Sequence, residues 1–300
     1  MAETVIKEIH LDLIVDRIHE GRCVPFLGAA SNVKSEKLNY DGLPLGADVA
    51  SELVKTMGEF KGRDPRDLAR VSLQYAFETD RPALLQRLRN LLPDEYRQPS
   101  LLLQVLAQLP VRLVVTTNYD RLLERALQGV KKYETIIQQA EGFPSTPETR
   151  ARFEELEGYQ GLILYKIHGS FLDLVNGDDL SPVIITEEDY VQFLTVVGQE
   201  NIGIPRLIQK MVVPSTLLFL GYSLEDWDFR TIYKGMIETL PKHQARKSFA
   251  IQKDPSEFWV SFWESKGVVI YNLDLYDFAE QLKQAYEKKF GKLSGNLTGE

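Results

Sequence analysis

Six short apolar runs, most of them followed by a loop and a helical pattern, constrain the fold of this chain more than any other feature. They have the apolar, often β-branched character of strands buried on both faces. Strands that alternate with helices predict an α/β fold, a Rossmann-like parallel sheet with helices on both faces. The runs lie at 22–27, 111–115, 162–167, 216–220, 248–252 and 268–273. A further run at 182–186, followed by a helical pattern, indicates an accessory strand and helix.

The segment between the first two runs is longer than a single crossover helix needs. It holds three or four helical patterns, among them "GADVASELVKTM" and "RPALLQRLRNLL", and so predicts a helical module inserted at about 44–110. The polar stretch 128–161 predicts a loop with one short helix. We therefore expect one domain over residues 1–300, with the helical module as an insertion.

The composition excludes several classes of protein. The chain is 44% hydrophobic and 26% charged, which fits a folded globular protein. Its net charge of -8 would repel a phosphate backbone, so we expect no direct nucleic-acid partner. The single cysteine, Cys23, allows neither an intrachain disulfide nor a zinc site of two or more thiolates, and fits a cytoplasmic location. No apolar run approaches the roughly 20 residues that span a bilayer, so we expect no membrane contact.

Small and polar residues follow four of the runs directly. Ligands of open parallel sheets bind outside the carboxyl ends of the strands, so each of these positions is a candidate site. Gly28 and two alanines form a turn that lets backbone N–H groups approach a diphosphate, although such turns also serve close packing. Asn118 can orient a water molecule or a ribose hydroxyl. Gly221 and Ser223 can approach a ligand after the fourth run.

Three polar groups at this edge also have structural interpretations. A lone histidine at a strand end, such as His168, is a core residue or a proton acceptor. Asp120 suits the N-cap of the helix that follows it. The acids Glu225, Asp226 and Asp228 either bind a metal or favour the first turn of a helix, and we expect no metal.

Familiar nucleotide and hydrolase motifs are absent from the sequence. There is no G-x-x-x-x-G-K-[ST], which argues against a P-loop NTPase. There is no G-x-G-x-x-G after the first run, which argues against an ordinary dehydrogenase. There is also no G-x-S-x-G of a serine hydrolase.

Taken together, the motifs "FLGAASN", "GLPLG", "TTNYD", "KIHGS", "ITEEDY" and "LFLGYSLEDWDFR" resemble the sirtuin-type (SIR2-type) NAD-binding fold over roughly residues 20–275. The resemblance is greatest to its bacterial defence-associated branch. It implies that Asn118 and His168 are catalytic and that Asp120 lies near the nicotinamide. It also implies that the glycine turn lies against the NAD phosphates. The NAD-binding set implied in this way is Gly28, Ala29, Ala30, Ser31, Asn32, Thr117, Asp120, Gly221 and Ser223.

Departures from the family pattern bear on the activity. Sirtuin deacylases carry a zinc ribbon held by four cysteines, and one cysteine cannot form it. The acidic and arginine motif that usually follows the glycine turn is missing as well, and Ala30 stands at the turn's third position. These departures disfavour peptide deacylation. Cleavage of NAD itself needs no zinc, because the nicotinamide is already a cationic leaving group.

The resemblance implies an NAD+ hydrolase, with NAD as substrate and no metal, that depletes NAD during phage infection. Because uncontrolled NAD cleavage would kill the cell, we expect gating by a homo-oligomer or by a partner, a HerA-like ring ATPase or a prokaryotic Argonaute. The aromatic segment "EFWVSFWESKG" is either an interface or a helix packed on the sheet. The alternative function is a non-catalytic subunit that binds NAD or ADP-ribose and regulates its partner.

Overall fold

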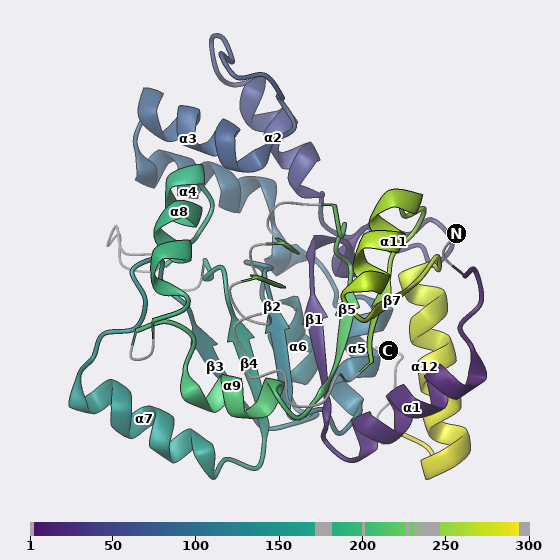
Figure 1. Cartoon of the computed structure of the whole chain (residues 1–300). Helices are drawn as coiled ribbons and strands as arrows, with labels where there is room; N and C mark the ends of the chain where they lie inside the picture. The colour runs from purple at the N-terminus through teal and green to yellow at the C-terminus, as the bar shows by residue number, and fades with distance from the viewer. Residues whose placement is uncertain are drawn as a thin grey trace.

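A seven-stranded parallel sheet forms the centre of the protein (Figure 1). The structure is a computed structural model that describes residues 3–171, 182–199, 202–225, 229–230, 233–234 and 247–293. The strand order is β3-β4-β2-β1-β5-β6-β7. The strands are β1 (Cys23–Leu27), β2 (Leu113–Thr116), β3 (Tyr133–Ile137), β4 (Leu162–Lys166), β5 (Thr216–Leu220), β6 (Ser248–Ile251) and β7 (Val268–Tyr271). The predicted Rossmann-like α/β fold is confirmed.

Helices cover both faces of the sheet, because neighbouring residues of each strand point to opposite faces and both sets are apolar. In β4, Leu162 and Leu164 belong to one core cluster, whereas Ile163 and Tyr165 belong to the other. The first cluster includes side chains of α1 (Glu8–His19), α5 (Leu101–Gln108), α6 (Leu122–Leu127) and α12 (Leu275–Phe290). The second includes α7 (Pro147–Glu157), α8 (Glu187–Val196), α9 (Arg206–Val212) and α11 (Glu257–Ser265).

A module of three helices lies above one end of the sheet, beside α8 (Figure 1). It consists of α2 (Gly46–Val54), α3 (Leu68–Glu78) and α4 (Arg81–Leu91), followed by the short turn η2 (Asp94–Tyr96). These helices share a core cluster of their own, which Phe171, Val183 and Ile185 join from the sheet domain. The module therefore packs directly onto the segments that follow β4.

The helix α5 lies within the segment 44–110 that the sequence assigns to the inserted module, but it packs elsewhere. Its buried leucines belong to the cluster on the sheet, and it contacts α6 and α12. Periodicity alone shows that a helix has an apolar face and not which core receives it.

Two segments differ from the sequence prediction. The stretch 128–161 contains the strand β3 as well as the helix α7, where only a loop and a short helix were expected. β3 is an edge strand with mostly half-buried or exposed residues, so it lacks the apolar run by which the other strands were recognised. The expected strand at 182–186 is reduced to one bridge between Gly169 and Val183. The helix after it is present as α8.

No helix among the described residues is long and apolar enough to cross a membrane.

Candidate functional site

The site residues predicted from the sequence gather at one edge of the sheet. One residue from each strand lies in a continuous row at the carboxyl ends: Ile137, Lys166, Thr116, Leu27, Leu220, Ile251 and Tyr271. Asn118 and His168 each lie two residues beyond a member of this row, on the neighbouring strands β2 and β4. Strands β2, β3 and β4 lie on one side of β1 in the sheet, and β5, β6 and β7 lie on the other side. The topological switch point therefore lies between β1 and β5.

The loops after β1 and β5 are hydrogen-bonded to each other. The N–H of Gly28 donates to the Leu220 carbonyl over 2.9 Å, and the N–H of Ala30 donates to the Gly221 carbonyl over 3.0 Å. Gly221 has a φ of 80°, and a Cβ atom there would lie 2.4 Å from the backbone nitrogen of Ser31. Glycine is therefore required at this position by both backbone conformation and space.

These bonds bear on the predicted phosphate contact of the glycine turn. The turn forms one 3-10 turn, η1 (Ala29–Asn32), in which Ser31 donates its N–H to the Gly28 carbonyl. The N–H groups of Gly28, Ala30 and Ser31 all have acceptors within the protein. A phosphate contact at this turn stays a prediction.

The side chain of Asn118 is fixed by the loop after β1. Its Nδ2 donates to the Gly28 carbonyl over 3.2 Å and to Oγ of Ser31 over 3.0 Å. Its backbone N–H donates to Oγ1 of Thr116 over 3.0 Å. The half-buried amide is thus held in one orientation, which the loops of two neighbouring strands set together. Thr117, before it, donates its N–H to the Leu27 carbonyl.

His168 lies in an aromatic and almost fully buried environment. The residue is 1% exposed, and its ring centroid lies 5.1 Å from that of Tyr190 and 6.0 Å from that of Phe193. Burial lowers the pKa of His168 to about 3, because the charged ring would lose its hydration. The ring is therefore neutral near pH 7. Its Nε2 atom is buried and has no hydrogen-bond partner among the described residues, which is a rare state for a buried polar atom.

Asp120 and Asn32 form a polar pair between the loops after β2 and β1. Nδ2 of Asn32 lies 3.3 and 3.4 Å from the two carboxylate oxygens of Asp120, and the N–H of Leu122 donates to Oδ1 over 2.9 Å. The Oδ1 atom of Asn32 is buried and has no hydrogen-bond partner in the part of the chain that the structure describes. Burial is the largest cause that raises the pKa of Asp120 to about 6, and the cation of Lys166 opposes it.

Lys166 is a buried cation that sequence reasoning missed. Its side chain is fully buried, and Nζ lies 3.0 Å from Oε1 of Glu124 and donates to the backbone carbonyl of Asp120 over 2.5 Å. The ion pair joins β4 to α6, and Nζ also contacts the loop that carries Asn118 and Asp120. A lysine at the end of an apolar run was the available signal.

The fourth predicted segment follows β5. Tyr222 donates its hydroxyl to the Leu27 carbonyl over 3.0 Å, which fixes the backbone between Gly221 and Ser223 against β1. Ser223 is half-buried beside them. Of the three acids considered as metal ligands, Asp226 and Asp228 lie outside the described residues. Within the described ranges, no cluster of three or more potential metal-ligating side chains occurs.

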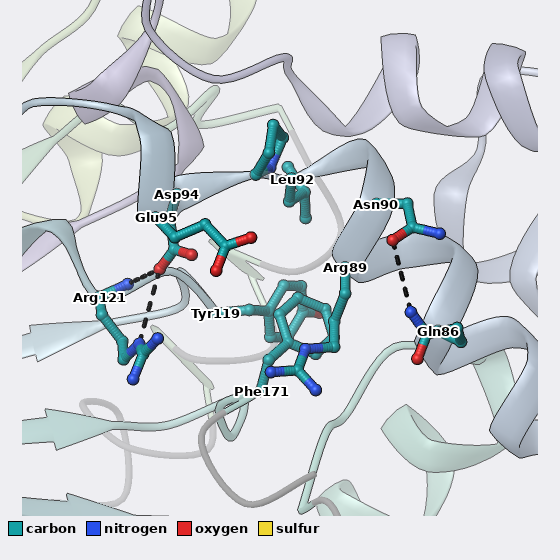
Figure 2. Close-up of a pocket in the computed structure, with 10 residues that line it drawn as sticks. Gln86, Arg89, Asn90, Leu92, Asp94, Glu95, Tyr119, Arg121 and Phe171 are labelled. Carbon is teal, nitrogen blue, oxygen red and sulfur yellow. Dashed lines mark hydrogen bonds and ion pairs between the residues drawn. The ribbon is translucent and has the colours of Figure 1, made fainter. Parts of the chain in front are cut away.

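A pocket of about 170 Å³ lies between the helical module and the loop after β2 (Figure 2). Tyr119, which stands between Asn118 and Asp120, forms part of its wall and packs against Phe171 with ring centroids 5.2 Å apart. The other wall comes from the end of α4 and from η2. The remaining lining residues are Gln86, Arg89, Asn90, Leu92, Pro93, Asp94, Glu95 and Arg121.

We expect Asp120→Asn to change how the stability of the protein depends on pH. The raised pKa of Asp120 means that the folded state binds this proton more tightly than the unfolded state does. The resulting stabilisation is present below about pH 4 and is lost as the pH rises through about 6. The stability of the variant relative to wild type should therefore increase from about pH 4.5 to about pH 7.5 in urea unfolding. A constant difference over this range would contradict a raised pKa.

Comparisons with known proteins agree with the motifs. NAD(+) hydrolase ThsA of Cytobacillus dafuensis is 24% identical over 309 residues, which cover 95% of this chain and 56% of that protein. Defense-associated sirtuin 2 of Bacillus subtilis is 27% identical over 203 residues, covering 62% of this chain and 18% of that protein. The chain thus spans little more than half of one relative and less than a fifth of the other.

A solved structure described as "Structural Basis for the Mechanism and Regulation of Sir2 Enzymes" aligns with 94% of this chain and 99% of its own, at a TM-score of 0.44 and 12% identity. The SIR2-like domain family matches residues 112–271, from the start of β2 to the end of β7. Because this match spans more than half of the 300 residues, the chain belongs to the SIR2-like domain family.

Proposed function

We propose that this chain is an NAD+ glycohydrolase that cleaves NAD+ to nicotinamide and ADP-ribose and acts in bacterial anti-phage defence by depleting NAD. The observation that carries the proposal is the placement of Asn118 and His168 at equivalent positions beyond two paired strands, with the buried Nε2 of His168 unpartnered. The names of the relatives, NAD(+) hydrolase ThsA and defense-associated sirtuin 2, support the same activity and role.

The chemistry suits these residue types. Departure of the nicotinamide leaves positive, oxocarbenium-like charge on the ribose, so the protein has to orient the ribose and admit water on one face only. A neutral His168 can accept a hydrogen bond, and then a proton, from a ribose hydroxyl or from the attacking water. Asn118 is held through Nδ2, which leaves its Oδ1 without a donor among the described residues and able to hold that hydroxyl or water.

Gating of this activity is part of the proposal. We infer that the activity is controlled by self-association or by a partner chain, with a HerA-like ring ATPase as the first partner to test and a prokaryotic Argonaute as the second. A cytoplasmic location is proposed with it, because the substrate and both partners are intracellular. The surface of α11 supports a contact site, since Phe258 is 66% exposed and stacks beside Phe262.

The test is the stoichiometry of NAD+ loss and nicotinamide release by the purified chain, alone and with each candidate partner. We expect one nicotinamide and one ADP-ribose for each NAD+ consumed. The alternative function, a regulatory subunit that binds NAD or ADP-ribose, predicts saturable ADP-ribose binding with no turnover under any of these conditions. That second result would overturn the proposed hydrolase.

A further inference from the structure

We propose that Arg89, from the last turn of α4, binds the nicotinamide-side phosphate of the dinucleotide in the pocket between the helical module and the loop after β2. This inference rests on the proposed function, since it takes NAD as the ligand. It adds a residue from the helical module to a site that the motifs place only on the sheet.

The pocket adjoins the predicted catalytic loop. Tyr119 and Arg121 line it, and they flank Asp120 in the sequence, while Phe171 follows His168 by three residues. The hydroxyl of Tyr119 donates to the Ile184 carbonyl over 2.7 Å, which fixes the ring at the boundary between pocket and sheet. At about 170 Å³, the pocket is smaller than the roughly 300–1,000 Å³ of pockets that enclose a whole ligand. It therefore suits one end of a dinucleotide.

Arg89 is the cation in this pocket that the described protein leaves unpaired. The residue is half-buried, its guanidinium has no hydrogen bond or ion pair with any described residue, and Figure 2 shows no dashed line to it. Arg89 lies in the last turn of α4, where the helix dipole favours a basic residue. The dipole explains a basic residue at this position, but it does not explain why the side chain lines a pocket. A guanidinium that faces a partly enclosed space is suited to bind a phosphate through two parallel N–H donors.

The other charged groups of the pocket have partners or are exposed to solvent. Asp94 accepts the backbone N–H of Arg121 over 2.6 Å and lies 3.9 Å from Nε of the same residue, so these two charges offset each other. Glu95 also lines the pocket but is exposed, so water screens its charge. Arg89 is thus the charged pocket residue that has neither a described partner nor an exposed position, which favours an anionic ligand.

The position of the pocket along the sheet selects the phosphate. Asn118 and His168 follow β2 and β4, on the same side of β1 as the pocket, whereas Gly221 and Ser223 follow β5 on the other side. If the scissile bond lies at Asn118 and His168, the phosphate nearest to it is the one on the nicotinamide side. Arg89 should then contact that phosphate and not the phosphate attached to adenosine.

The experiment compares binding of ADP-ribose, which carries both phosphates, with binding of AMP, which carries only the adenosine-side phosphate. We expect Arg89→Gln to weaken ADP-ribose binding by about tenfold in isothermal titration calorimetry and to leave AMP binding unchanged. Arg87→Gln is the matched control, because Arg87 lies on the same helix but does not line the pocket. It should change neither ligand, and circular dichroism checks that both variants are folded.

Two outcomes would overturn the inference: an unchanged affinity of Arg89→Gln for ADP-ribose, or an equal loss for ADP-ribose and AMP. Failure of the proposed function gives a different result. If wild type binds ADP-ribose through Arg89 but never releases nicotinamide, the binding residue stands and the hydrolase does not. If wild type cleaves NAD+ and the KM of Arg89→Gln is unchanged, the hydrolase stands and the inference fails.

Discussion

Replacing His168 with alanine should lower kcat for NAD+ cleavage by about 10²- to 10⁴-fold, the usual contribution of a positioned proton acceptor. The expectation rests on the buried Nε2 atom, which forms no hydrogen bond with any described residue that the substitution would remove. Affinity for ADP-ribose should persist, because the proposed phosphate contact comes from Arg89 on another element. The measurement is the initial rate of nicotinamide release at saturating NAD+, together with ADP-ribose binding.

The control for this substitution is His19→Ala. His19 is exposed on α1, stacks on Phe290 with ring centroids 3.7 Å apart, and lies on a helix whose buried apolar residues belong to the cluster on one face of the sheet. Its replacement should leave the rate unchanged. A His168→Ala variant that is folded and retains the wild-type kcat would show that His168 is a core histidine, the structural interpretation that the sequence left open.

The pH dependence of the rate separates His168 from Asp120. With a pKa lowered to about 3, His168 stays neutral over the range in which the protein is assayed, so it should produce no acidic limb near its ordinary value. Asp120, with a pKa raised to about 6, titrates in that range. An acidic limb near pH 6 that disappears in Asp120→Asn and persists in wild type is the expected profile.

The central strands and the site edge could be predicted because both depend on simple rules. Buried parallel strands are continuous apolar runs, and loops that follow them meet at one edge, so Asn118 and His168 could be placed together from their positions alone. The edge strand β3 could not be recognised in the same way, because its half-exposed residues resemble a loop. The packing of α5 against the sheet could not be predicted either, because its sequence shows an apolar face but not which core that face contacts.

Residues of the pocket and the buried ion pair could not be predicted from the sequence for a different reason. Arg89 and Tyr119 are far apart in sequence, and they line one pocket only because the helical module packs beside the sheet. Lys166 lies within the apolar run 162–167, but its long side chain reaches Glu124 and the backbone of Asp120 inside the protein. Charge partners of this kind depend on tertiary packing, which sequence spacing does not specify.

Lys166→Met should destabilise the protein by about 3–5 kcal/mol, because it removes one partner of a buried ion pair and leaves the other charge without compensation. Glu124 is only 8% exposed, so water cannot replace the lost ammonium group. The matched control is Lys210→Met, which breaks an exposed pair with Glu157 at 2.6 Å and should cost less than about 1 kcal/mol. Urea unfolding of both variants measures the difference.

The double variant Lys166→Met with Glu124→Leu separates the contribution of Lys166 to stability from its contribution to catalysis. Removing both charges eliminates the uncompensated carboxylate, so most of the lost stability should return. The backbone carbonyl of Asp120 would still lack the donor that Lys166 provides. Because that carbonyl belongs to the loop that carries Asn118, kcat should stay low even when stability is restored. Recovery of both stability and kcat would show that the ion pair contributes to stability only. Recovery of stability without kcat would identify Lys166 as the residue that positions the catalytic loop.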